Sequence, residues 1–241
     1  MDASELRVKI VGCGGIGGHL APNLCHFLHA ERRAAHVTLI DGDAYEARNR
    51  TRMRFARLGN KAAVMAAELA RAFGDVLTIE PVPEYLTAGN VARSIADGDL
   101  VLAAVDNHAT RHLLDEHAVT LAEVTLISGG NDGVDGEHDG TYGNVQIVRR
   151  ADGRWLTSSL GGYHPEIRRP ADRSPGELGC ADLAQAGAAQ LLFTNLAVAS
   201  AMLNAFYGLL RGTARYEEVC LDISRNRAVP IERVAPALPS G

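Results

Sequence analysis

The sequence predicts an α/β fold with a Rossmann-like, mostly parallel sheet and a C-terminal antiparallel extension. Three observations support this prediction. Short apolar runs alternate with helical patterns over residues 1–128, a spacing typical of parallel strands joined by right-handed crossovers. A glycine-rich loop directly follows the first apolar run. Two strand-like segments near the C-terminus are joined by a short polar turn, which is typical of a hairpin.

Composition indicates one globular domain spanning residues 1–241. Apolar residues make up 46% of the chain and charged residues 22%, which is typical of a folded protein with a substantial core. Residues 1–128 are expected to form a nucleotide-binding half, and residues 129–241 a crossover loop, a long helix and a C-terminal hairpin. The net charge of −5 argues against nucleic acid as a partner.

Apolar periodicity places the elements of the first half. The expected strands are Val8–Val11, Val37–Asp41, Val76–Ile79, Asp99–Val105 and Val124–Ser128. The expected helices are Ile16–Leu28, the segment from an Asn60 cap to about Phe73, Val91–Ala96 and His108–His117.

The second half carries weaker patterns. Gly129–Gly140 is glycine- and acid-rich and is expected to be a loop, and Arg150–Gly179 a long, mobile segment without periodicity. The expected strands are Asn144–Arg149, Glu217–Ile223 and Ala228–Ile231, of which the last two form the hairpin. Leu183–Leu210 is an apolar helical stretch with a candidate interruption at Thr194–Asn195, and no membrane-spanning segment is expected.

Two features predict that the chain binds a nucleotide. Gly12, Gly14, Gly15 and Gly17 fit the pattern G-x-G-G-x-G. Glycines at these positions let backbone N–H groups approach a phosphate. Asp41 ends the second strand, the position from which a carboxylate holds a ribose hydroxyl. These features are also typical of NAD and FAD sites, so they do not identify which nucleotide binds.

The segment after this acid favours a triphosphate. It is rich in cations, which are Arg48, Arg50, Arg52, Arg54, Arg57 and Lys61. A dehydrogenase needs no such cluster of cations beside its ribose-binding acid. Attack at the α-phosphorus of a triphosphate needs several cations there. The P-loop pattern G-x-x-x-x-G-K-[ST] is not found in the sequence. An NAD-dependent oxidoreductase stays open as an alternative, although it leaves Asn49, Arg52 and Lys61 without a role.

Taken together, the motifs resemble those of the ThiF/MoeB/HesA and ubiquitin-activating-enzyme-like adenylyltransferases. That family has the glycine loop, a D-x-D, an Asn, an Arg-Gln pair, a Lys and an Asp-Asn after the fourth strand. The matching residues here are the four glycines, Asp41-Gly42-Asp43, Asn49, Arg52-Met53, Lys61 and Asp106-Asn107. The segments YHPEI and ELGC are also similar to ThiF-type proteins of plasmid-associated PRTRC systems.

The resemblance implies an ATP-dependent reaction. The C-terminal carboxylate of a small ubiquitin-like protein or peptide would be adenylated, and pyrophosphate released. Asp41 would hold the ribose and Asp106 would hold Mg²⁺, a hard cation that prefers oxygen ligands. Asn49, Arg52 and Lys61 would bind the polyphosphate. A homodimer is implied as well.

The resemblance also assigns the remaining site residues. Besides the four glycines, the expected nucleotide-binding residues are Asp41, Asp43, Asn49, Arg52, Lys61 and Asn107. The expected catalytic residues are Arg52, Lys61, Asp106 and Cys180.

Three departures separate the chain from that family. Met53 stands where the family has Gln, which removes one polar contact. Seven residues precede the first strand, whereas many relatives carry an N-terminal helix whose arginine completes a partner subunit's site. The C-x-x-C pairs that bind zinc in many relatives are not found, so no zinc is expected. These departures keep open a non-catalytic nucleotide-binding scaffold of the same fold.

Cysteine use predicts a reducing, cytoplasmic location. Cys13, Cys25, Cys180 and Cys220 lie far apart, and the N-terminal residues do not form a signal-peptide pattern. Cys180 lies between a Gly/Pro-rich segment and a helical pattern, and a helix N-terminus lowers the pKa of a thiol. In some relatives a cysteine in this region forms a thioester. Cys180 is therefore a candidate for transfer after adenylation, with a packing role as the alternative.

Overall fold

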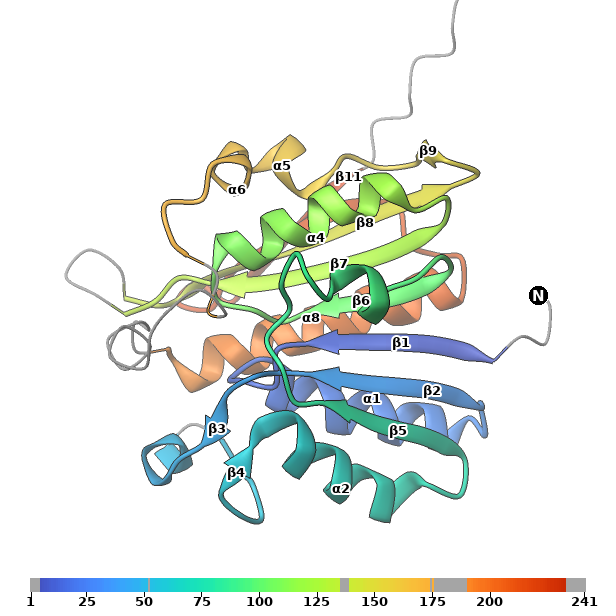
Figure 1. The fold of residues 1–241 in the computed structure, drawn as a ribbon. Helices are drawn as coiled ribbons and strands as arrows, with labels where there is room; N and C mark the ends of the chain where they lie inside the picture. The colour runs from blue at the N-terminus through green and yellow to red at the C-terminus, as the bar shows by residue number, and fades with distance from the viewer. Residues whose placement is uncertain (1–4, 52, 135–138, 174, 176–189, 233–241) are drawn as a thin grey trace, which may run out of the picture.

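A nine-stranded sheet organises the chain, with the strand order β11-β10-β8-β7-β6-β1-β2-β5 and β9 paired to β8 (Figure 1). The computed structural model describes residues 5–51, 53–134, 139–173, 175 and 190–232. The parallel strands are β1 (Leu6–Val11), β2 (Ala35–Ile40), β5 (Leu77–Val82), β6 (Asp99–Ala103) and β7 (Val124–Asn131). The antiparallel strands are β8 (Tyr142–Ala151), β9 (Arg154–Trp155), β10 (Tyr216–Asp222) and β11 (Arg227–Glu232). The predicted fold class, including the antiparallel extension, is confirmed.

Helices cover both faces of this sheet. On one face lie α1 (Gly17–Ala30), α2 (Lys61–Phe73) and α8 (Leu192–Leu210). On the other lie α3 (Val91–Ser94), α4 (His108–Thr120), α5 (Leu160–Tyr163) and α6 (Pro165–Arg168). Figure 1 shows α4 in front of the sheet and α8 behind it. Each face has its own hydrophobic core, so the central strands are apolar on both sides.

The chain order of the strands places a crevice between β1 and β6. From β1 the chain continues outward to β2 and β5, and then returns to β6 on the other side of β1. Such a reversal leaves a gap at the carboxyl ends of the two strands, where ligands bind in open α/β sheets. The carboxyl ends of the parallel strands all face the left edge in Figure 1. The glycine loop and the acids after β2 and β6 lie at this edge.

The predicted elements of the first half are confirmed, with ends shifted by a few residues. Asn60 caps α2 as predicted, because its Oδ1 accepts the N–H of Ala63 at 2.9 Å. Strand β7 runs on to Asn131, into the predicted acidic loop, because Gly129, Gly130 and Asn131 pair with β8. A small sheet formed by β3 (Ala44–Tyr45) and β4 (Gly59–Asn60), with the 3-10 turn η1 (Ala47–Thr51) between them, was not predicted.

Arg150–Gly179, which the sequence predicts to be a long, mobile segment, contains regular elements in its described part, residues 150–173 and 175. This part holds the end of β8, then β9, α5 and α6. Two well-separated apolar side chains, Leu160 and Ile167, anchor it in the second core. The carboxylate of Asp115 in α4 accepts the N–H groups of Leu160 and Gly161 at 2.8 and 3.1 Å. Because only these two apolar side chains anchor the described part of the segment, its sequence shows no helical or strand periodicity.

Helix α8 begins at Leu192 and runs through Thr194 and Asn195 without a break, which corrects the predicted interruption. Both polar side chains are fully buried and hydrogen-bonded: Thr194 donates to the carbonyl of Gly140, and Asn195 accepts from Asn131 at 2.8 Å. In the part of the chain that the structure describes, α8 alone is long and apolar enough to cross a membrane. It packs on β7, β8 and α1, as a core helix does. Residues 183–189 of the predicted stretch lie outside the described residues.

Candidate functional site

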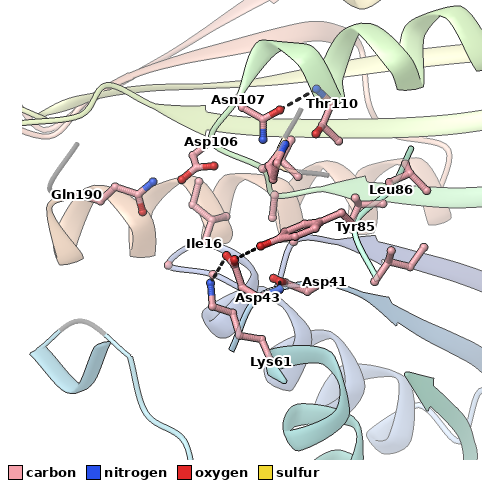
Figure 2. A pocket seen from close by; sticks show the side chains of 18 of the residues that line it. Ile16, Asp41, Asp43, Lys61, Tyr85, Leu86, Asp106, Asn107, Thr110 and Gln190 are labelled. Carbon is pink, nitrogen blue, oxygen red and sulfur yellow. Dashed lines mark hydrogen bonds and ion pairs between the residues drawn. The ribbon is translucent and has the colours of Figure 1, made fainter. Parts of the chain in front are cut away.

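A cavity of about 750 Å³ lies at the carboxyl ends of β1, β2 and β6 (Figure 2). Among its lining residues are Gly12, Gly14, Gly15, Asp41, Asp43, Lys61, Asp106 and Asn107, all predicted from the sequence. Segments from the first and second strand ends, the start of α2 and the start of α4 therefore meet here. We call this space the nucleotide cavity, after the ligand that the sequence predicts.

The four glycines of the loop differ in what surrounds them. Gly12 has a φ of 91°, and a Cβ there would lie 2.5 Å from the carbonyl oxygen of Ala104. A Cβ on Gly17 would overlap the carbonyl oxygen of Gly12, and one on Gly15 would overlap the side chain of Asn195. Gly14 alone of the four has no atom within 4 Å of its Cβ position. Gly14 thus presents open backbone to the cavity, whereas Gly17 does not line it and lets α1 pack on the loop.

Asp41 ties the glycine loop to the end of β2. Its Oδ2 accepts the N–H of Cys13 at 2.6 Å, and its Oδ1 accepts the N–H of Asp43 at 2.8 Å. Burial raises the pKa of Asp41, while Lys61 and the two N–H donors act in the opposite direction. The carboxylate lines the cavity, so a contact with a ribose stays a prediction that this geometry permits.

Lys61 is held at the cavity by the turn that carries the two acids. It is the first residue of α2, and its Nζ lies 2.8 Å from Oδ2 of Asp43 (Figure 2). The Asn60 amide donates to the carbonyls of Asp41 and Asp43 at 2.8 and 3.1 Å, which fixes the start of α2 to this turn. Burial acts to lower the pKa of Lys61, but Asp41, Asp43 and Asp106 outweigh it and raise the pKa. The side chain is therefore charged at neutral pH.

Tyr85, Leu86 and Gln190 also line this cavity and were not predicted. The hydroxyl of Tyr85 donates to Asp43, and its ring lies so close to Gly42 that a Cβ there would be 2.6 Å away. Tyr85 and Leu86 follow β5, the sheet neighbour of β2. Their position after that strand is the signal that sequence reasoning could have used.

Asp106 and Asn107 form the wall that adjoins α4. Asn107 caps this helix, since its Oδ1 accepts the N–H of Thr110 at 2.7 Å (Figure 2). Among the described residues, no group of three His, Cys, Asp or Glu side chains could hold a metal. A Mg²⁺ at Asp106 would therefore take its other oxygens from phosphate and water, which is common for this ion.

The structure does not bring every predicted residue to the cavity. Asn49 is buried in the connection after β3, where its Oδ1 accepts the N–H of Glu46 at 2.8 Å. It does not line the nucleotide cavity, whereas Met53 does. Arg50 lies over the ring of Phe55, 4.7 Å from its centroid. Arg52 and Cys180 lie outside the described residues, so their predicted roles stay predictions.

A second cavity, with about 850 Å³ of space, lies beside the first turn of α4 and was not predicted. We call it the α4 cavity. Its wall includes His108, Arg111, Asn144, Gln146, His164, Glu166 and Glu218. His164 lies between two acids, with Nε2 2.7 Å from Glu218 and Nδ1 3.0 Å from Glu166. These residues are scattered over the sequence, so only the fold brings them together.

The hydrogen bond to Glu218 raises the pKa of His164, against the effect of burial, and Glu166 adds to the increase. Asn144 and His108 are the other polar groups near it. Because the folded pKa lies above the unfolded value of about 6.5, the protonated form stabilises the fold at low pH. That contribution is lost as the pH rises through the folded pKa.

We therefore expect the free energy of unfolding to fall as the pH rises above about 6.5. His164→Gln should remove this dependence, because glutamine does not titrate. Urea denaturation of both proteins at a series of pH values measures the difference. A wild-type protein whose stability relative to the variant rises over this window would contradict the expectation.

Comparisons with known proteins point to one family and its fold. A family model described as the ThiF family matches residues 2–208. The SAMP-activating enzyme E1 of Haloferax volcanii is 31% identical over 113 residues, which cover 46% of this chain and 40% of that protein. The molybdopterin-synthase adenylyltransferase of Escherichia coli is 31% identical over 128 residues, covering 52% and 49%. The matched stretch thus spans less than half the length of either relative.

Solved structures resemble nearly the whole chain. MccB of E. coli, crystallised with selenomethionine-labelled MccA, has a TM-score of 0.69 at 14% identity and covers 98% of this chain and 66% of its own. MccB crystallised with ATP has a TM-score of 0.65, also at 14% identity, and covers 98% and 65%. At such identities this likeness establishes the fold alone.

Proposed function

This chain belongs to the ThiF family, and from that premise we propose that it uses ATP to adenylate the C-terminal carboxylate of a small ubiquitin-like protein or peptide. The observation that carries the proposal is the meeting of Lys61, Asp106 and the open backbone at Gly14 in one cavity. The names of the relatives, an activating enzyme and an adenylyltransferase, support the same reaction.

In this proposal the glycine loop and the N-terminus of α1 hold the phosphates, because N–H groups and the helix dipole favour anions there. The substrate carboxylate attacks the α-phosphorus, a P–O bond forms, the bond to pyrophosphate breaks, and pyrophosphate leaves. A carboxylate is ionised at neutral pH, so no general base is needed. Lys61 stabilises the negative charge that grows around the α-phosphorus. Catalysis then rests on alignment and on charge.

Asp106 would hold a Mg²⁺ ion, which would offset the charge of the departing pyrophosphate. We expect Asp106→Asn to lower ATP–pyrophosphate exchange by about 100-fold or more, because the amide is a weaker ligand for this ion. The matched control is Asp75→Asn, an exposed acid paired with His29 and Arg32. An Asp106→Asn protein that exchanges as fast as the control would contradict the proposed role.

Two measurements test the function itself. Calorimetry compares Mg-ATP with NADH, and only the first is expected to bind. Carboxylate-dependent exchange of labelled pyrophosphate into ATP then tests the chemistry, with ubiquitin-like proteins and peptides as acyl substrates. Binding of NADH in preference to ATP would instead support the oxidoreductase, and ATP binding without exchange would support a non-catalytic scaffold.

The proposal extends to a later step and to assembly. Cys180 would accept the acyl group as a thioester with release of AMP, the step for which the sequence makes it a candidate. Alkylation of Cys180 should then stop transfer but leave exchange intact, and unimpaired transfer would remove this role. A cytoplasmic homodimer is part of the same proposal, and light scattering measures the mass in solution.

A further inference from the structure

Tyr85 reaches the nucleotide cavity from the turn after β5, and its hydroxyl donates to Oδ1 of Asp43 (Figure 2). The other oxygen of this carboxylate, Oδ2, lies 2.8 Å from Nζ of Lys61. A neutral donor and a charged donor therefore share one carboxylate, with one oxygen for each. Because Lys61 is the proposed cation at the α-phosphorus, a group that shares its counter-ion also affects where that cation lies.

Buried groups hold the turn that carries Tyr85. The side chain of Asn90 is 6% exposed, and its Nδ2 donates to the carbonyl of Tyr85 at 2.8 Å. Its Oδ1 accepts the N–H of Thr87 at 2.7 Å. Leu86, between the two, packs in the second core. The backbone on both sides of Leu86 is thus fixed, so the hydroxyl of Tyr85 approaches Asp43 from an anchored position.

Gly42 makes this close approach possible. A Cβ on Gly42 would lie 2.6 Å from two ring carbons of Tyr85 and 2.7 Å from its backbone nitrogen. The backbone of Asp43 is fixed on the other side, because its N–H donates to Oδ1 of Asp41 and its carbonyl accepts the N–H of Lys61, both at 2.8 Å. A side chain at position 42 would therefore push Tyr85 away from Asp43.

The ion pair between Lys61 and Asp43 is suited to exchange. The side chain of Lys61 is 12% exposed, but that of Asp43 is 45% exposed, and water weakens an ion pair with so exposed a partner. Lys61 can therefore leave Asp43 for a phosphate at a modest cost. Asp43 then keeps the hydroxyl of Tyr85 as a donor. Without that hydroxyl, Oδ1 of Asp43 would lose this bond and turn toward Lys61, which would hold the lysine back.

Resting on the proposed function, we propose that Tyr85 is a positioning residue for adenylation. Its hydroxyl holds one oxygen of Asp43, and this lets Lys61 move from Asp43 to the α-phosphate in the transition state. The hydroxyl contributes most as negative charge grows at the phosphorus, because Lys61 then exchanges its partner. This role requires the hydroxyl of Tyr85 and the charge of Asp43, whereas a ring that only contacts the nucleotide requires neither.

Tyr85→Phe removes the hydroxyl and keeps the ring. We expect kcat for ATP–pyrophosphate exchange to fall about tenfold, with KM for ATP within about twofold of wild type. The matched control is Tyr163→Phe, because the hydroxyl of Tyr163 also donates to an acid, Glu217, at 2.9 Å but outside the nucleotide cavity. Unchanged kcat in Tyr85→Phe would overturn the proposal. A rise in KM alone would also overturn it, since that result indicates contact with the bound nucleotide.

A double-mutant cycle tests whether the hydroxyl acts through Asp43. Asp43→Asn keeps the shape of the side chain but removes the charge that Tyr85 shares with Lys61. In this background, Tyr85→Phe should lower kcat by less than about twofold, because the two residues act on the same lysine. An equal loss of kcat in both backgrounds would show that the hydroxyl acts independently of Asp43, and this would overturn the proposal.

A measurement without catalysis separates this proposal from the proposed function. The chain has two lysines, so labelling with carbon-13 lysine gives two Cε signals in the NMR spectrum, which Lys9→Met assigns. Tyr85→Phe should shift the Lys61 signal, and Tyr163→Phe should not. If this shift is seen but the wild-type protein exchanges no pyrophosphate, the adenylation is wrong and the positioning of Lys61 by Tyr85 stands. If Tyr85→Phe exchanges normally and the Lys61 signal does not move, the positioning is wrong and the adenylation stands.

Discussion

Lys61→Met is expected to lower the rate of ATP–pyrophosphate exchange by about 10²–10³-fold. The side chain faces the nucleotide cavity, is 12% exposed, and has its charge secured by the surrounding acids. A fixed cation in a site with little water stabilises the charge of a transition state far more than a mobile one in water. Methionine keeps the length and apolar stem of lysine but removes that charge.

The chain offers a close control for this change. Its two lysines are Lys9 and Lys61. Lys9 lies on β1, where its Nζ donates to Thr38 at 3.2 Å and lies 3.9 Å from Asp99, and it does not line the nucleotide cavity. Lys9→Met should therefore exchange at the wild-type rate.

The kinetics of Lys61→Met also separate two roles for the charge. A fall in kcat with KM unchanged would place the contact in the transition state, whereas a rise in KM alone would place it in ATP binding. We expect the first pattern to dominate. Exchange by Lys61→Met within twofold of the wild-type rate would show that this lysine does not act on the phosphates.

Gly17→Ala is expected to destabilise the protein by about 3 kcal/mol or more, or to prevent folding. The new Cβ would overlap the carbonyl oxygen of Gly12, which is backbone and cannot move aside as a flexible side chain does. Relief would require α1 to shift away from the loop, and α1 carries the fully buried core residues Leu20, Leu24 and Leu28.

Gly14→Ala is the matched control in the same loop. Nothing lies within 4 Å of its Cβ position, so its free energy of unfolding should stay within about 0.5 kcal/mol of wild type. Because Gly14 lines the cavity, this variant should instead bind ATP more weakly. Urea denaturation and ATP calorimetry on both variants measure the two effects. Equal stability of the two variants would contradict the division of roles among the glycines.

The sequence predicted the architecture and the charged and glycine residues that meet at the nucleotide cavity. Alternating apolar strands and helices fix a parallel sheet, and the residues after each parallel strand then meet at one edge. This is why Asp41, Lys61 and Asp106, far apart in the chain, could be assigned to one site. Asn49 does not line the cavity, because its side chain bonds within its own turn, and a motif does not reveal that competition.

The sequence by itself determined the local features: the strand and helix periods, the glycine loop and the acids that end strands. The tertiary structure alone decided which glycine faces a ligand and which only lets the backbone approach, since that depends on atoms from distant elements. It also decided the α4 cavity, where α4 supplies Arg111, β8 supplies Gln146, and α6 and β10 flank His164. A cavity lined by side chains that share no period and no motif exists only once the chain has folded.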